Sequence, residues 1–142
     1  MAARGQTSYD VRVWKVTGRY KIRNIGRLVA TQPPDADLYC HCRNHPLPWL
    51  DMYLMCWNLR AYDEIIRGVY RKLEQDATPT SAEQLFRKVL DGHSFASKIV
   101  RRFRHVPDID GIRGGDNLAY GGMKRKYWAR VLANRLLPWV WI

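Results

Sequence analysis

Apolar residues recur at helical spacing along residues 46–75, the longest such stretch in the chain. The residues on this face are Met52, Met55, Cys56, Leu59, Tyr62, Ile66, Val69 and Leu73. Intervals of three and four residues place them on one side of an α-helix. A neighbouring stripe consists of Trp49, Tyr53 and Trp57. The pattern predicts a long central amphipathic helix whose first half is buried on two sides and around which the remaining elements pack.

The N-terminal part of the chain has the alternation of β-strands. Residues 9–16 and 19–23 are rich in β-forming residues and are separated by Thr17 and Gly18, which favour a turn. We therefore expect a β-hairpin within residues 1–31. One face of its second strand carries Arg19, Lys21 and Arg23. This row of cations fits a solvated strand face and a surface for an anionic partner equally well.

Two further helices are expected within residues 80–105. Thr80 and Glu83 have the spacing of a capping box, and Asp91-Gly92 resembles a helix end. Ser94 can then cap a helix with Phe95, Ile99 and Phe103 on its apolar face. The cations on its other faces are Lys98, Arg101, Arg102 and Arg104. A solvated face is the default interpretation of such a charge run, and an anionic partner is the functional one.

The C-terminal part combines a glycine-rich loop, residues 106–122, with a basic amphipathic helix and an aromatic tail, residues 123–142. The loop lacks the residues that phosphate-binding and EF-hand loops require. The helix places Tyr127, Val131, Leu132 and Leu136 on one face, and its cations are Lys124, Arg125, Lys126, Arg130 and Arg135. The tail ends in Trp139, Trp141 and Ile142, which suit an anchor at a membrane interface or in a partner's groove, although burial in the chain's own core is the alternative.

These elements predict a single domain, residues 1–142, that is mainly α with a small N-terminal β-hairpin (α+β). A chain of 142 residues can bury a core without disulfides. Residues 1–10 lack the apolar run of a secretory signal, and no stretch has about 20 uninterrupted apolar residues, so we expect no membrane-spanning helix.

The charge balance implies an acidic partner. The formal net charge is +11 and the pI is about 10.0, and residues 1–30 carry seven Arg or Lys against one Asp. Six Trp and eight Tyr accompany this charge, a composition that suits interfaces. The partner could be RNA, an anionic phospholipid surface, with Lys124, Arg125 and Lys126 around a lipid head group, or an acidic protein.

The three cysteines indicate free thiols or a reducing compartment rather than a disulfide scaffold. Cys40, Cys42 and His45 form the only metal-like cluster. One residue between the two cysteines is too few for the usual zinc pair, and no second Cys or His pair follows at the usual distance. We therefore expect no metal and no cofactor.

No arrangement of acidic, nucleophilic or histidine residues indicates catalysis. We expect a non-catalytic structural or accessory subunit that binds other subunits of a large complex. The setting we favour is the periphery of a mitochondrial respiratory-type membrane complex, on the matrix side of the inner membrane. The alternative is a mitochondrial or other ribosomal protein that contacts rRNA through the basic hairpin and helix. A metal- or thiol-dependent enzyme is the remote alternative.

Overall fold

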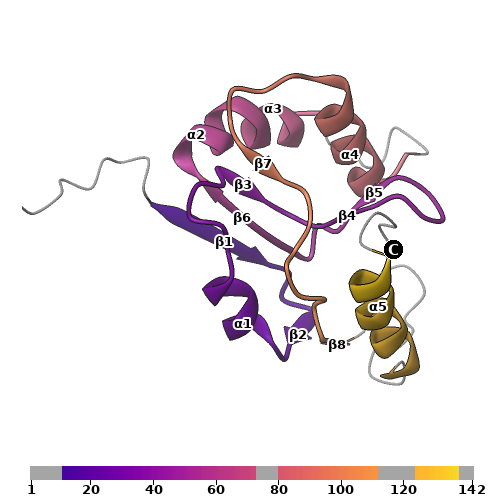
Figure 1. Ribbon diagram of the computed structural model, residues 1–142. Helices are drawn as coiled ribbons and strands as arrows, with labels where there is room; N and C mark the ends of the chain where they lie inside the picture. The colour runs from indigo at the N-terminus through magenta and orange to yellow at the C-terminus, as the bar shows by residue number, and fades with distance from the viewer. Residues whose placement is uncertain (1–10, 73–79, 112–123, 138–142) are drawn as a thin grey trace, which may run out of the picture.

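The computed structural model describes residues 11–72, 80–111 and 124–137 (Figure 1). Over these ranges the chain is a mixed α/β protein with eight strands in three sheets. The predicted fold class, mainly α with an N-terminal hairpin, is therefore wrong. None of the described helices is long and apolar enough to cross a membrane.

The largest sheet has four strands in the order β1-β6-β3-β7. Their bounds are β1 Arg12–Val16, β6 Leu54–Asn58, β3 Leu38–Tyr39 and β7 Ile99–Val100. β6 pairs antiparallel with β1 and with β3, whereas β3 and β7 run parallel. Strands from the first, second and last thirds of the described chain thus meet in one sheet.

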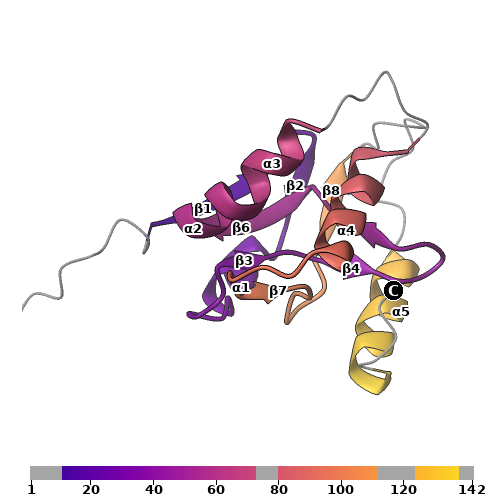
Figure 2. The same ribbon diagram turned by 90° about the horizontal axis from the view of Figure 1, so that it is seen from above.

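Both faces of this sheet are covered, and every residue of β6 is buried. Met55 and Trp57 belong to the core between the sheet and the helices at the top of Figure 1, which we call the upper core. These helices are α2 (Leu59–Ala61), η2 (Tyr62–Ile66), α3 (Arg67–Tyr70) and α4 (Ala82–Gly92). Leu54 and Cys56 point to the opposite face, into a lower core shared with Leu28 of α1 (Ile25–Ala30). Figures 1 and 2 show α2, α3 and α4 on one side of the sheet and α1 on the other.

Two short sheets complete the structure. β2 (Tyr20–Ile22) pairs with β8 (Ile109–Gly111), and β4 (Cys42–Arg43) pairs with β5 (Trp49–Leu50). Gly111 has a φ of 144°, and a Cβ there would lie 2.4 Å from the carbonyl oxygen of Arg19. The close approach of β8 to the turn before β2 therefore requires a glycine.

The predicted central helix is wrong because its first half is β-structure. Residues 49–50 and 54–58 form β5 and β6, and the helical segment begins only at Leu59. A strand buried on both faces loses its polar alternation and reads as a continuous apolar run. Such a run also matches one face of a helix, so its spacing alone does not distinguish the two.

The predicted hairpin is also wrong, although both of its strands exist. β1 pairs with β6 and β2 pairs with β8, so neither strand pairs with the other. The turn between them carries the chain from the four-stranded sheet to a separate two-stranded one. A short turn between two strands favours a hairpin, and the sequence of the turn gives no sign that each strand pairs with a segment more than 35 residues away.

The two helices predicted in residues 80–105 differ in outcome. The first is present as α4, with its capping box one residue later than expected: the Ser81 hydroxyl accepts from the Gln84 N–H. The second, from Ser94 to Arg104, is wrong because this segment is extended and includes β7. Its backbone carbonyls accept hydrogen bonds from residues 37–42, as in the 3.0 Å bond from Cys40 N to Val100 O.

The last predicted helix is present as α5 (Lys124–Leu136). Part of the predicted glycine-rich loop, Ile109–Gly111, forms strand β8. The remainder of that loop from residue 112, and the tail with Trp139, Trp141 and Ile142, lie outside the described residues.

Candidate interface for an anionic partner

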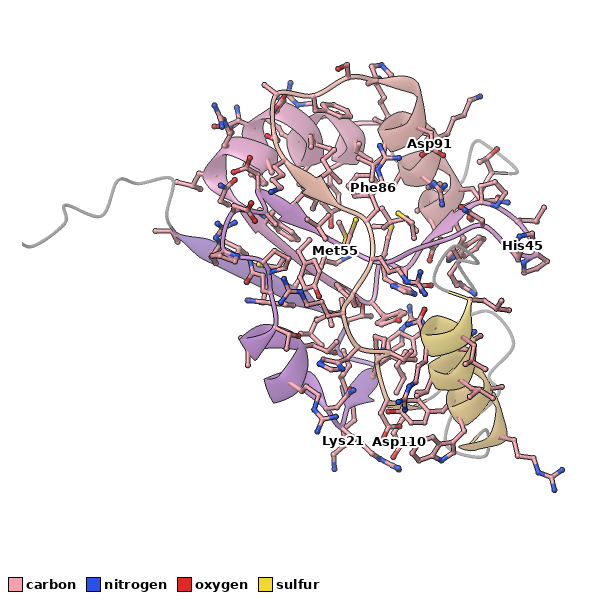
Figure 3. All side chains as sticks on the ribbon, in the orientation of Figure 1. Lys21, His45, Met55, Phe86, Asp91 and Asp110 are labelled. Carbon is pink, nitrogen blue, oxygen red and sulfur yellow. The ribbon has the colours of Figure 1, made fainter. Side chains whose placement is uncertain are left out.

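The cations of the predicted hairpin lie on and beside β2, close to β8. Arg23 Nη2 lies 2.7 Å from Asp110 Oδ2, and this ion pair lowers the pKa of the Asp110 carboxyl. Lys21 faces Asp110 across the β2–β8 ladder, and both lie at the end of the molecule remote from α4 (Figure 3). Arg19 and Lys21 are exposed, and neither forms a salt bridge with another described residue. They are available to a partner, whereas Arg23 is partly neutralised.

The cations predicted on a helix at residues 98–104 are instead distributed along an extended segment. Lys98 forms an ion pair with Asp35, and Arg101 Nη1 lies 2.8 Å from Asp91 Oδ1. Arg102 is half-buried, and burial lowers the pKa of its guanidinium. Arg104 is exposed and has no salt bridge within the described ranges. The four cations therefore do not form one basic surface.

Asp91 joins α4 to two other parts of the structure. Its carboxylate accepts from Arg87 Nε at 2.7 Å as well as from Arg101. Arg87, which is buried, also donates to the backbone oxygen of Arg43 and to Asn44 Oδ1, both at 2.8 Å. This cluster attaches α4 to strand β4 and to the segment after β7, so Arg87 and Arg101 serve the fold.

Two other carboxylates bind backbone N–H groups in loops. Asp37 accepts from the Lys98 N–H at 2.8 Å and from Asn58 Nδ2 at 2.6 Å. Glu64 accepts from the N–H groups of residues 96 and 97 at 2.6 and 2.9 Å. Hydrogen bonds to Ser97 and this backbone lower the pKa of Glu64. These acidic side chains thus hold chain segments together inside the fold. The exposed cations Arg19 and Lys21 form no salt bridge with such a carboxylate among the described residues.

His41 is a buried histidine whose pKa lies far below the ordinary value of an imidazole. Its ring stacks on Phe103 with 5.4 Å between ring centroids, and Nδ1 accepts from the Phe103 N–H at 3.4 Å. Burial, with smaller contributions from the charges of Arg43, Arg102 and Arg130, lowers the pKa of His41 to about 3. The ring is therefore neutral near pH 7 and acts as a core side chain.

The thiols are buried in two different places. Cys40 and Cys42 lie in the upper core and Cys56 in the lower core, and all three are free. A hydrogen bond to Cys42, together with burial, raises the pKa of Cys40. His45 is exposed at the tip of the β4–β5 connection (Figure 3). Within residues 11–72, 80–111 and 124–137, no group of three or more His, Cys, Asp or Glu could hold a metal ion.

Helix α5 carries two neighbouring apolar stripes that differ in exposure. Tyr127 and Val131 are partly covered, whereas Trp128, Leu132 and Leu136 are exposed. Arg125 is also exposed, and Lys124 and Lys126 lie in the first turn. The predicted apolar face included Leu132 and Leu136 but omitted Trp128. The interval of four residues from Trp128 to Leu132 and on to Leu136 was the signal for this second stripe.

Comparison with known proteins found no matching family model, no similar curated protein and no similar solved structure.

Proposed function

We propose that the chain is a non-catalytic accessory subunit that binds at the periphery of a large membrane complex, with a mitochondrial respiratory-type complex, on the matrix side of the inner membrane, as the setting. The observation that carries this proposal is that three acidic side chains are bound within the fold, whereas basic side chains remain exposed on its surface. The carboxylates of Asp37, Glu64 and Asp91 accept hydrogen bonds inside the fold, whereas Arg19 and Lys21 are exposed and form no salt bridge with another described residue. Such a surface attracts an anionic partner.

The environment of the reactive side chains supports a non-catalytic role. His41 is enclosed and neutral, and the thiols of Cys40 and Cys42 are fully buried. Asp51 is buried against Arg43 at 2.7 Å, which is an internal ion pair. General acid–base or nucleophilic catalysis needs such groups within reach of a substrate. Each of these groups has a structural role instead.

The membrane setting is favoured over the ribosomal alternative because of which basic elements exist. The rRNA-binding hypothesis depended on a basic hairpin and a basic helix at residues 94–104, and neither element forms. Helix α5, on which the membrane hypothesis depended, does form, and it carries an exposed Trp. RNA binding is retained as an outcome of the experiment below.

The test is sedimentation of the tagged full-length chain from detergent-solubilised cells, with and without ribonuclease and across a salt series. We expect it to migrate with a large particle that resists ribonuclease and dissociates in harsher detergent. The double variant Arg19→Glu/Lys21→Glu should leave the particle at lower salt than the wild type because two attractive charges are reversed.

Arg71→Glu/Lys72→Glu is the control for this experiment. It makes the same change in net charge at the end of α3, where Glu74 and Asp76 follow in the sequence, and it should behave like the wild type. Migration as a free monomer would refute the proposal. Loss of the particle after ribonuclease would instead identify the anionic partner as RNA.

A further inference from the structure

The outer face of α5 carries the three most exposed large apolar side chains of the described structure. Trp128, Leu132 and Leu136 are 65%, 57% and 62% exposed. Residues four apart lie on the same side of a helix, so the three side chains form one continuous stripe along α5. An exposed apolar stripe of this kind on a protein surface marks an interaction site.

The stripe faces away from the rest of the protein. The partly covered residues of α5 include Tyr127, Arg130 and Asn134, and the side that these three form lies opposite the stripe on the helical wheel. The charge of Arg130 acts on both His41, just before β4, and Asp51, just after β5, which places this side of α5 toward β4 and β5. Figures 1 and 2 both show α5 beside β4. The stripe is therefore open to a partner.

The charges beside the stripe define the chemistry of that partner. Arg125 and Arg135 are exposed, and the helical wheel places them among Trp128, Leu132 and Leu136. Residues 124–137 contain no Asp or Glu. The partner must therefore offer apolar surface and negative charge together along about 20 Å, the length of 13 helical residues.

We propose that the outer face of α5 lies on an anionic phospholipid bilayer, with Trp128, Leu132 and Leu136 in the boundary between head groups and acyl chains and Arg125 and Arg135 at the phosphates. A bilayer surface provides both required properties over any length of helix, and Trp is favoured at this depth. The adjoining sequence continues with Trp139 and Trp141. This inference rests on the proposed function and identifies lipid as a direct contact.

The test is co-sedimentation of the purified full-length protein with two kinds of vesicle. One is made of phosphatidylcholine alone, and the other contains about 30% of the anionic lipid phosphatidylglycerol. We expect the apparent affinity for anionic vesicles to exceed that for neutral ones by about tenfold or more. Trp128→Gln/Leu132→Gln should lower the affinity for anionic vesicles by about tenfold or more, because it removes apolar side-chain area that the bilayer buries in the bound state. Arg125→Gln/Arg135→Gln should remove most of the preference for anionic lipid.

Leu47→Gln/Tyr70→Gln is the matched control, since it replaces two exposed apolar side chains on other elements. It should bind vesicles within about twofold of the wild type. All variants exchange exposed side chains, and unchanged thermal unfolding would confirm their folding. Equal binding by the Trp128→Gln/Leu132→Gln variant, or equal binding to neutral and anionic vesicles, would overturn the inference.

The two proposals fail in different ways. A protein that ignores vesicles but sediments with a ribonuclease-resistant particle would refute lipid contact by α5 and retain the accessory-subunit role, with an acidic protein surface as the occupant. A protein that binds anionic vesicles through α5 but sediments with no large particle would retain the lipid contact and refute the accessory-subunit role.

Discussion

His41 illustrates how a titratable residue becomes a structural one. Its ring is enclosed against Phe103, and its Nδ1 must remain unprotonated to accept the Phe103 N–H. The folded protein therefore keeps this imidazole neutral to about pH 3, whereas the unfolded chain binds a proton near pH 6.5. Below pH 6.5 the unfolded state binds more protons than the folded state, so acid favours unfolding.

We predict that the free energy of unfolding falls below pH 6.5 by up to about 1.4 kcal/mol per pH unit from this one residue. His41→Gln should reduce the slope by this amount, even if the variant is less stable overall. Urea denaturation at several pH values between 6.5 and 5 measures the slope. His45→Gln, which replaces an exposed histidine, serves as the control. Identical slopes for His41→Gln and the wild type would contradict the prediction.

Asp51 acts in the opposite direction and makes this comparison between variants necessary. Burial raises the pKa of its carboxyl, so its folded form binds a proton more readily than its unfolded form does. Stability from this group increases as pH falls through its raised pKa and partly offsets the loss from His41. Asp51 is present in both proteins of the comparison, so the difference in slope reports His41.

At the scale of elements, the sequence predicts helices better than it predicts strand pairing. α4 was predictable because capping signals and an apolar face lie within one short segment. β6 was not predictable from its spacing, because burial on both faces removes the alternation that identifies a strand. The partners of β1 and β2 are distant in sequence, and short-range patterns carry no information about them.

The candidate interface was predictable to the same limited extent. The exposed cation Lys21 was identified from alternation, which holds inside a strand whatever its partner is, and Arg19 lies in the turn just before that strand. The roles of Arg101 and Asp91 were not visible, because their contact depends on how α4 packs against the segment after β7. Net charge can be read from composition, but which charges neutralise each other requires the fold.

Asn58 marks the boundary between β6 and the helical segment and suggests a second prediction. Its Oδ1 accepts from the Ala61 N–H at 3.0 Å, which caps the helix, and its Nδ2 donates to Asp37. Asn58→Ala should destabilise the protein by about 2 kcal/mol, because it removes a cap and leaves buried polar groups unpaired. Ser81→Ala removes only the α4 cap and should cost about 1 kcal/mol.

Chemical denaturation of both variants measures this difference. Equal losses of stability would contradict the structural role assigned to the bond between Asn58 and Asp37.

At the scale of the whole molecule, the two cores share one strand. Leu28 lies in the lower core and Phe86 in the upper core, and β6 sends alternate side chains into each. Loss of either core would remove the cover from one face of β6 and expose apolar area to water. The two cores should therefore unfold together.

We predict that Leu28→Ala and Phe86→Ala, at about 3–5 kcal/mol each, both lower the midpoint of one common transition. Thermal unfolding followed by far-ultraviolet circular dichroism and by Trp fluorescence tests this, because coincident curves indicate a single transition. Leu47→Ala, at an exposed position, should change stability by less than about 0.5 kcal/mol. Two separated transitions in the Leu28→Ala variant would show that the cores are independent.

The position of β6 also determines where the chain can tolerate sequence change. Four consecutive residues of β6 are buried and face one core or the other: Leu54, Met55, Cys56 and Trp57. A substitution at any of these positions must therefore fit the volume and polarity of the core that it faces. In a library of single substitutions selected for folding, these four positions should accept the narrowest range of residues. The outer face of α5 should accept a wide range under the same selection, and its residues should become restricted only when membrane attachment is selected instead.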